Sequence, residues 1–298
     1  MNDELNPGDV LSYSAGSTQT GPDGYRKLRD RPGLLGSVVR RWPELIKAIG
    51  ARTPMLINAY PAALGSAGSG ISVDTYLSPR VMSRALQLAA RAEKPVILCG
   101  QSLFLADALL AHVNAKRPLP DTMFLMVGGY VTPHSLERTL REVLAPHVQR
   151  ILIVQGYGVA EVDAGCMMAL DRDERGQLIF YPREDVECEL DGDQLLLSLR
   201  GPDGALVVER WRTGDSAARV ADGYALWNHA RMHPTVHEAL ESWTTEDWRR
   251  RTGYVRREGD TLWIQLRKEH TPRHEHELDH WDYGRRFDFS WLNKPNWS

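Results

Sequence analysis

Three short segments of this sequence place glycines beside side chains that can contact ligands. The first, residues 14–18, reads Ser-Ala-Gly-Ser-Thr. Small residues let backbone N–H groups approach phosphate oxygens closely, and Ser and Thr hydroxyls add further donors. The same composition fits an ordinary surface loop, because Ser and Gly are common in loops of every kind. Phosphate binding and a simple loop are both open for this segment.

The second segment, residues 155–161, reads Gln-Gly-Tyr-Gly-Val-Ala-Glu and ends an apolar run. The ring of Tyr157 could stack on a base, and the carboxylate of Glu161 could hold Mg²⁺ against a triphosphate. The alternative is a turn at the end of a strand, with a packed tyrosine and a solvated glutamate. Both interpretations place these two side chains where a strand ends.

The third segment, residues 211–215, reads Trp-Arg-Thr-Gly-Asp, and Ala-Asp-Gly-Tyr follows at 221–224. A carboxylate held on a tight glycine turn can accept two hydrogen bonds from a ribose diol. The alternative for Asp215 is the aspartate of an ordinary β-turn.

The elements that would position these segments alternate between strand and helix over the first half of the chain. Ser102 is the expected N-cap of one helix, and Trp42-Pro43 is an expected break in another. Strands are predicted at 55–60, 95–100, 122–129 and 150–158, helices at 33–49, 79–92, 102–113 and 135–145, and a loop at 12–24. This alternation predicts an α/β fold with a largely parallel sheet and flanking helices.

After about residue 165 the pattern changes to strand-like runs separated by Asp-Gly turns at 191–192 and 203–204. Such a run of strands predicts an antiparallel β subdomain. Residues 234–250 look helical, and 251–268 should form a hairpin that turns at 258–260. We therefore expect a core over 1–232, followed over 233–298 by the hairpin and a short aromatic and His-rich extension.

The composition is that of an ordinary globular protein, with 42% hydrophobic and 25% charged residues in 298. The net charge of −3 gives no general attraction to nucleic acid or anionic membranes. Three cysteines without a C-x-x-C pair argue against a disulfide framework or a structural zinc site. No window is apolar enough to cross a membrane, so we expect a cytoplasmic protein.

Taken together and in order, the three segments resemble the motifs of the adenylate-forming superfamily of acyl-CoA synthetases, adenylation domains and luciferases. In that family a Ser/Thr/Gly loop cradles the ATP phosphates, a Y-G-x-[ST]-E segment supplies a tyrosine against adenine and a Mg²⁺-linked glutamate, and a [YWF]-x-T-G-D segment supplies the aspartate for ribose. The resemblance covers roughly residues 10–225.

Further features resemble the branch that contains phenylacetate–CoA ligase and bacterial acyl-protein synthetases. They are an Asn-Ala-Tyr strand before a Gly-rich segment (58–70), the run from Lys94 to Leu103, and the pair Gly128-Gly129. In the family the Gly-Gly segment passes beside adenine.

The resemblance implies ATP-dependent formation of an acyl-adenylate from a small carboxylic acid, with ATP, Mg²⁺ and CoA as candidate cofactors. The acyl group would pass to CoA, a carrier protein, an amine or a protein acceptor. The resemblance implies catalysis by Thr18 and Glu161, with Glu161 also binding the metal. It implies a substrate pocket at Tyr60, Gly65, Gly100 and Gln101. The residues implied to bind the nucleotide are Ser14, Gly16, Ser17, Thr18, Gly128, Gly129, Gln155, Gly156, Tyr157 and Asp215.

The sequence departs from the family in ways that keep other functions open. No lysine follows the first segment before Lys27, and Ala160 replaces the family's hydroxyl residue. We also expect the leading subdomain and the lysine-bearing C-terminal domain to be absent, and a partner protein or a second copy to cover the exposed surface. The alternatives are a catalytically degenerate nucleotide-binding subunit that acts with a partner enzyme, and a transferase that receives a ready-made adenylate or acyl-CoA.

Two features outside the motifs also invite functional interpretations. Cys166 could accept an acyl group or be a buried structural thiol. The tail could bind a metal, be solvated, or anchor its aromatic rings on the core or on another protein. Its residues are His270, His274, His276 and His280, and Trp281, Tyr283, Phe287, Phe289, Trp291 and Trp297.

Overall fold

A computed structural model describes most of the first 266 residues. The described ranges are 10–13, 25–28, 40–60, 71–75, 77–129, 131–159, 161–170, 172–227, 238, 240–249, 252–258 and 261–266. Within them, no helix is long and apolar enough to span a membrane.

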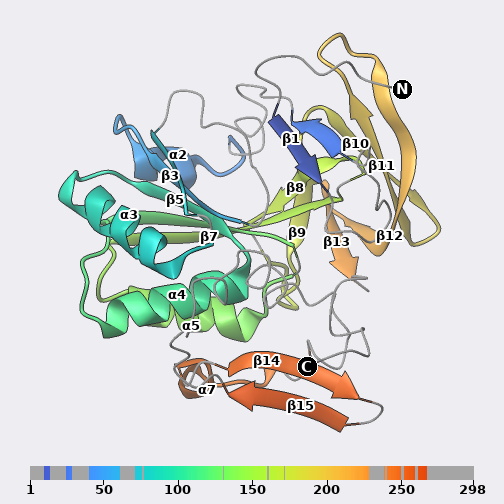
Figure 1. The fold of residues 1–298 in the computed structure, drawn as a ribbon. Coiled ribbons are helices and arrows are strands. Elements are labelled where there is room, and N and C mark those ends of the chain that lie inside the picture. The colour runs from blue at the N-terminus through green and yellow to red at the C-terminus, as the bar shows by residue number, and fades with distance from the viewer. Residues whose placement is uncertain are drawn as a thin grey trace.

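Helices and strands are interspersed between residues 43 and 159, whereas the described regular elements between residues 163 and 227 are strands alone (Figure 1). One further helix, at 245–249, precedes the last two strands. The helices are α2 (Pro43–Ile49), α3 (Pro79–Arg91), α4 (Ser102–Asn114), α5 (His134–Leu144) and α7 (Thr245–Arg249). The strands are β1 (Val10–Tyr13), β2 (Tyr25–Leu28), β3 (Met55–Ala59), β4 (Ile71–Asp74), β5 (Val96–Gly100), β6 (Thr122–Val127), β7 (Arg150–Val159), β8 (Asp163–Ala169), β9 (Ile179–Pro182), β10 (Val186–Asp191), β11 (Gln194–Arg200), β12 (Leu206–Val220), β13 (Gly223–Trp227), β14 (Thr252–Glu258) and β15 (Thr261–Leu266).

One sheet of 11 strands runs through the molecule, in the order β10-β11-β12-β13-β9-β8-β7-β6-β5-β3-β4. The strands from β4 to β7 are parallel to their neighbours, and those from β7 to β10 are antiparallel. The predicted fold class, a largely parallel α/β part joined to an antiparallel β part, is confirmed.

The parallel strands follow one of the two common doubly wound orders. After β3 the chain adds β4 on one side, then returns to place β5, β6 and β7 successively on the other. The point where the order reverses therefore lies between β3 and β5. In open α/β sheets this reversal leaves a crevice outside the carboxyl ends of the strands, and ligands commonly bind there.

Helices cover both faces of the parallel part, with α3, α4 and α5 together on one face and α2 on the other (Figure 1). Alternate residues of β6 show the two faces, because Met123 and Leu125 pack in the cluster with α3 to α5 while Phe124 packs with α2. Burial on both faces explains why such strands read as continuous apolar runs.

Local sequence accounts for the start of α3. Ser78 is its N-cap and its hydroxyl accepts a hydrogen bond from the N–H of Val81, and Pro79 occupies the first helical position. The helix buries Met82, Leu86 and Ala89 at the spacing of one face. Cap, proline and periodicity agree, and the predicted helix 79–92 is confirmed within one residue.

Strands β8 to β13 enclose a second core, formed by inward-facing residues such as Phe180, Leu195 and Leu197. Tyr157 of β7 packs against this cluster from the parallel part. The two cores therefore meet along β7 and β8, next to the second of the three segments.

Several predicted boundaries are wrong. Residues 12 and 13, assigned to a loop, belong to β1, which pairs with β2 in antiparallel register. Ser102 is not the N-cap of α4, because the backbone stays extended through Gln101 and becomes helical only at Ser102. Strand β4, which pairs with β3 at the sheet edge, has no counterpart among the predicted elements.

Candidate functional site

Residues predicted for the pocket and the nucleotide meet at the carboxyl ends of β3, β5 and β6. Gly129 has a φ of 89°, and a Cβ built there would lie 3.1 Å from the Tyr60 hydroxyl and 3.3 Å from Gln101 Nε2. A Cβ on Gly128 would lie 3.6 Å from the carbonyl oxygen of Gly156. The two glycines are therefore enclosed by residues from neighbouring strand ends. This group flanks the point where the strand order reverses, where a ligand site is expected.

Gly100 has no room for a side chain. A Cβ there would lie 2.7 Å from Leu105 Cδ2 and 2.9 Å from the carbonyl oxygen of Ala59. Its own carbonyl oxygen accepts a hydrogen bond from the N–H of Gly128 at 3.3 Å. Gly100 thus brings the ends of β3, β5 and β6 close together, a packing role that the pocket assignment did not include.

Gln155 is buried, and both polar atoms of its side-chain amide form hydrogen bonds with other protein groups. Its Oε1 accepts hydrogen bonds from the backbone N–H and the hydroxyl of Thr132, at 3.0 and 2.7 Å. Its Nε2 donates to the carbonyl oxygens of Val127 and Gly156, each at 3.3 Å. The side chain therefore ties β7 to the segment that carries Gly128 and Gly129. Thr132, the partner in this contact, was missed from the sequence because only the fold brings it to Gln155.

Tyr157 and Asp215 are hydrogen-bonded to each other. The Tyr157 hydroxyl donates to Asp215 Oδ2 at 2.6 Å, across 58 residues of sequence. Asp215 is only 7% exposed. Burial raises the pKa of Tyr157, and the negative charge of Asp215 raises that pKa further. The Tyr157 ring also meets Phe180 edge-on, with ring centroids 6.0 Å apart, so both ends of the tyrosine are held.

Asp215 lies on a bulge and not on the tight turn predicted for it. Strand β12 continues through it, but the register with β11 shifts between the pairs Leu196–Arg212 and Gln194–Ser216. Gly214 takes a φ of 81° there.

The bulge carries its own hydrogen bonds. The N–H of Asp215 donates to the Thr213 hydroxyl at 3.1 Å, and that hydroxyl donates to the carbonyl oxygen of Leu195 at 3.0 Å. Thr213 therefore fixes the backbone that carries the carboxylate. Thr213 lies inside the Thr-Gly-Asp segment, and that position is the only indication of its two hydrogen bonds in the sequence.

Glu161 lies half-buried in the connection between β7 and β8. Cys166 follows on β8 and is fully buried, with its thiol donating to the carbonyl oxygen of Asp163. Burial raises the pKa of the Cys166 thiol to about 12. A buried, protonated thiol is a poor nucleophile, so the structural interpretation of Cys166 is favoured over acyl transfer.

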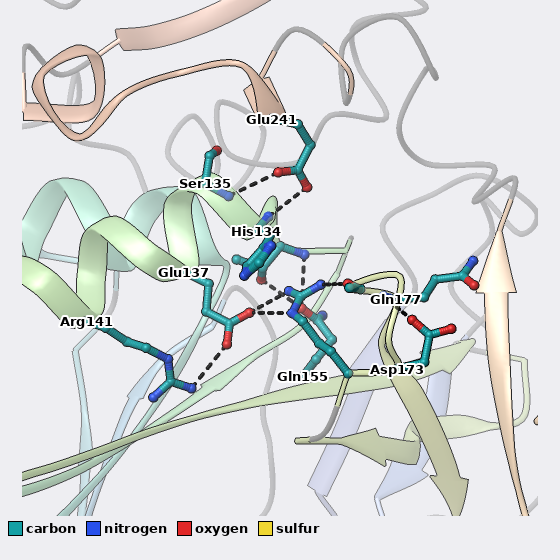
Figure 2. Close-up of polar contacts among 11 residues, drawn as sticks. His134, Ser135, Glu137, Arg141, Gln155, Asp173, Gln177 and Glu241 are labelled. Atoms are coloured by element: carbon teal, nitrogen blue, oxygen red, sulfur yellow. Dashed lines mark hydrogen bonds and ion pairs between the residues drawn. The ribbon is translucent and has the colours of Figure 1, made fainter. Parts of the chain in front are cut away.

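Glu241, an acidic residue that no sequence pattern marks, caps α5. The N–H groups of His134 and Ser135 donate to the carboxylate of Glu241 (Figure 2). On the first turn of the same helix, Glu137 pairs with Arg172 and Arg141. These contacts surround the start of α5, which directly follows the segment with Gly128 and Gly129.

Some of the predicted site lies outside the described residues. These are Ser14, Gly16, Ser17 and Thr18 of the first segment, Gly65 of the pocket, and the His and aromatic residues of the tail. Among the residues that the structure does describe, no group of three or more His, Cys, Asp or Glu side chains could hold a metal ion.

No protein-family model and no curated protein matches the chain. Solved structures similar to it include an anthranilate CoA ligase in complex with anthranoyl-AMP, at 20% identity and a TM-score of 0.47 over 74% of this chain and 46% of that one. A long-chain-fatty-acid-CoA ligase from Archaeoglobus fulgidus has 13% identity and a TM-score of 0.47 over 92% and 60%.

An AMP-forming acyl-CoA synthetase/AMP-acid ligase II-like protein from Dyadobacter fermentans has 12% identity and a TM-score of 0.43 over 70% and 58%. The chain thus spans 46% to 60% of the length of these three proteins. The phenylacetate–CoA ligase branch stays a prediction. The three solved structures named here are two CoA ligases and an AMP-forming acyl-CoA synthetase-like protein, and the chain is similar to them in fold.

Proposed function

We propose that this chain binds ATP and activates a carboxylic acid as an acyl-adenylate. One observation carries the proposal, the hydrogen bond from Tyr157 to Asp215. A base on the tyrosine ring would bring the attached ribose close to a carboxylate, which can accept hydrogen bonds from the ribose hydroxyls. The two residues come from separate strands, β7 and β12, and the resemblance implies a nucleotide contact for each of them.

The rest of the site supports the same ligand. Gly129 lies beside the Tyr60 hydroxyl and the Gln101 amide with no side chain of its own between them. A nucleotide on Tyr157 would reach this group at the carboxyl ends of the parallel strands. Gln155 has its amide bonded to Thr132, Val127 and Gly156, so we assign it the task of positioning this segment.

In the proposed reaction an oxygen of the acid attacks the α-phosphorus of ATP, and the bond to the bridging oxygen breaks with release of pyrophosphate. Catalysis of this kind rests mainly on alignment and charge stabilisation. Tyr157 and Asp215 would fix the nucleoside, and Tyr60 and Gln101 would border the acid. We assign phosphate contacts to Ser14, Gly16, Ser17 and Thr18, and the acyl acceptor to CoA, a carrier protein, an amine or a protein.

The donor set also fits a magnesium ion. Mg²⁺ usually takes only one or two carboxylates, together with water and substrate phosphates. A single glutamate at position 161, half-buried after β7, suits that pattern. Magnesium bound there would neutralise negative charge on the phosphates.

A second candidate function is a nucleotide-binding subunit that lacks turnover and assists a partner enzyme. Ala160 in place of a hydroxyl residue, and the absence of lysine between the first segment and Lys27, favour it. Binding of ATP without chemistry would distinguish this candidate from the first.

Acid-dependent exchange of pyrophosphate into ATP tests the proposal. Purified chain is assayed with a panel of aryl and alkyl acids, and exchange above the acid-free rate is expected for at least one. Glu161→Gln should abolish exchange, while Glu174→Gln, on an exposed turn, should leave it unchanged. ATP binding without exchange, for every acid and with added cellular extract, would favour the second candidate. Absence of ATP binding would overturn both.

A further inference from the structure

Helix α5 begins with a cap supplied from a distant part of the chain. Its N-cap residue is Pro133, whose side chain makes no capping hydrogen bond. The carboxylate of Glu241 takes that role, accepting from the N–H of His134 at 2.7 Å and from the N–H of Ser135 at 3.0 Å (Figure 2). A negative charge at a helix N-terminus is favourable, because the first N–H groups point outward without helical partners.

The nearer acidic residue is committed elsewhere. Glu137 lies in the first turn of α5, but its Oε2 accepts from Arg172 and its Oε1 accepts from Arg141 at 3.1 Å. Figure 2 shows Glu137 turned toward Arg141, on the side of the helix away from Glu241. The cap therefore depends on Glu241.

The segment that carries Glu241 is itself firmly attached to α5. The Ser135 hydroxyl donates to the carbonyl oxygen of Leu240 at 2.6 Å, and Trp248 Nε1 donates to the same hydroxyl at 3.2 Å. The hydroxyls of Thr139 and Thr245 lie 3.2 Å apart. Leu240 and Trp248 belong to the cluster that α3, α4 and α5 form with the sheet. Residues 240–249 are therefore held by hydrogen bonds and by apolar burial together.

The start of α5 follows the connection from β6, here called the segment 128–133, of which residues 128–129 and 131–133 are described. Its two glycines lie in the candidate nucleotide site. Gly128 is anchored by its hydrogen bond to Gly100, and Thr132 by its two hydrogen bonds to Gln155. Glu241 provides the third anchor, and it comes from 106 residues beyond Ser135. Loss of this anchor would free the start of α5 at His134, and with it the end of the connection that begins at Gly128.

We propose that Glu241 is a positioning residue of the nucleotide site, and that residues 240–249 set the affinity for ATP through the start of α5. The inference rests on the proposed function for its ligand. Glu241 acts through the helix end and the segment 128–133, and not by touching the nucleotide. None of the three sequence segments includes Glu241, because its contact with the start of α5 exists only in the folded chain.

The test compares three variants, two at Glu241 and one at Thr139, that weaken the contact between α5 and residues 240–249 at different points. Glu241→Ala removes the cap, and Glu241→Gln keeps one acceptor oxygen but no charge. Thr139→Val removes one hydrogen bond to the same segment and leaves the cap intact. ATP affinity is measured by calorimetry below the unfolding temperature of every variant. We expect Glu241→Ala to weaken ATP binding by about three- to tenfold, Glu241→Gln by less, and Thr139→Val by less than about twofold.

Hydrogen exchange of the amides of residues 128–135 gives a second readout. It should rise in Glu241→Ala and stay at the wild-type level in Thr139→Val. Unchanged affinity and exchange in Glu241→Ala would overturn the inference, as would equal effects of Glu241→Ala and Thr139→Val. If Glu241→Ala does not fold, Glu241→Gln decides by the same criteria. Wild-type protein that binds no ATP would overturn the proposed function, while the exchange data would still show whether Glu241 fixes the segment.

Discussion

At the scale of single residues, the contact between Tyr157 and Asp215 turns two separate sequence patterns into one arrangement. The tyrosine has the hydroxyl end held by the carboxylate and the ring held by Phe180. A side chain held at both ends offers a ligand a fixed surface, so its ordering costs little conformational entropy when the ligand binds. Removal of the Tyr157 hydroxyl tests whether Tyr157 and Asp215 act together in binding a ligand.

Tyr157→Phe keeps the ring and deletes the donor to Asp215. We expect a loss of about 1–3 kcal/mol in the free energy of unfolding, because a buried carboxylate loses a hydrogen bond. Discrimination between ATP and its 2′- and 3′-deoxy analogues should fall, while discrimination between ATP and GTP should persist. Urea denaturation and competition binding measure the two effects. If Tyr157→Phe distinguishes ATP from its 2′- and 3′-deoxy analogues as well as the wild type does, Tyr157 and Asp215 do not form one site.

Gly129→Ala tests the crowded surroundings of Gly129 in the candidate site. The variant forces a side chain into a positive φ and places its Cβ 3.1 Å from the Tyr60 hydroxyl. Gly192→Ala is the matched control, since it has a φ of 66° but nothing within 4 Å of the added Cβ. Both should lose about 1 kcal/mol of stability from the backbone conformation. Only Gly129→Ala should also weaken ATP binding, and equal binding by both variants would argue against a ligand beside Gly129.

The residues of the site differ in how far the sequence could identify them. Local patterns mark Tyr157, Asp215, Gly128 and Gly129, so the sequence alone could single them out as candidates. Thr132 and Glu241 were missed because their roles depend on partners 23 and 107 residues away. Gln155 lay inside a motif, yet the pattern could not show that its amide faces Thr132.

At the scale of elements, the structure agrees best with the prediction where periodicity and end signals coincide. Helix α3 has a cap, a proline and one apolar face, and its bounds were predicted closely. Strand β4 was missed because it is a four-residue edge strand, exposed on most of its length, that follows a Gly- and Ser-rich run. The bulge in β12 was read as a turn, since a positive-φ glycine marks both and only the pairing with β11 separates them.

A buried histidine joins α3 to α4 and makes their packing sensitive to pH. Nε2 of His112 donates to the carbonyl oxygen of Pro118 at 2.9 Å, and Nδ1 lies 3.0 Å from the Ser83 hydroxyl. Ser83 accepts from Arg117 at 2.7 Å, so its own proton points to Nδ1 of a neutral imidazole. Burial lowers the pKa of His112, and the charge of Arg117 lowers it further.

The stability of the protein should therefore fall in mild acid. With a folded-state pKa below the unfolded value of about 6.5, His112 contributes stability that is fully present above that pH. The contribution is lost as the pH falls below it toward the folded-state pKa, because the unfolded chain then binds the extra proton. The free energy of unfolding, measured from pH 8 to pH 5, should show this loss.

His112→Gln should flatten the pH dependence in this range, and His147→Gln, at an exposed position, should leave it as in the wild type. An identical pH profile for His112→Gln and the wild type would show that the acid sensitivity comes from other groups.

At the scale of the whole molecule, one continuous sheet links a parallel part to an antiparallel part. Tyr157 belongs to the last parallel strand and packs against the second core, and Asp215 belongs to the antiparallel part, so their hydrogen bond joins β7 to β12. The sequence could predict both parts from their different periodicities. It could not predict that the sheet is continuous, because strand pairing between distant segments leaves no local signal.

The packing of residues 240–249 also belongs to this scale. Trp243 and Trp248 stack edge-on with centroids 4.5 Å apart and lie in the cluster of the parallel part. The division of the chain after residue 232 stays a prediction, and this cluster shows that Leu240, Trp243 and Trp248 beyond it pack on the core.

We propose that Tyr157 and Asp215 form one nucleotide site. Calorimetric titration of ATP into the wild type and Asp215→Asn tests this proposal most directly. The control is Asp203→Asn, an exposed turn carboxylate. Wild type and Asp203→Asn should bind ATP with equal affinity, and Asp215→Asn should bind about tenfold more weakly or worse, as expected for the loss of a charged acceptor. Equal affinity of Asp215→Asn and the wild type, or no binding by the wild type, would contradict the account.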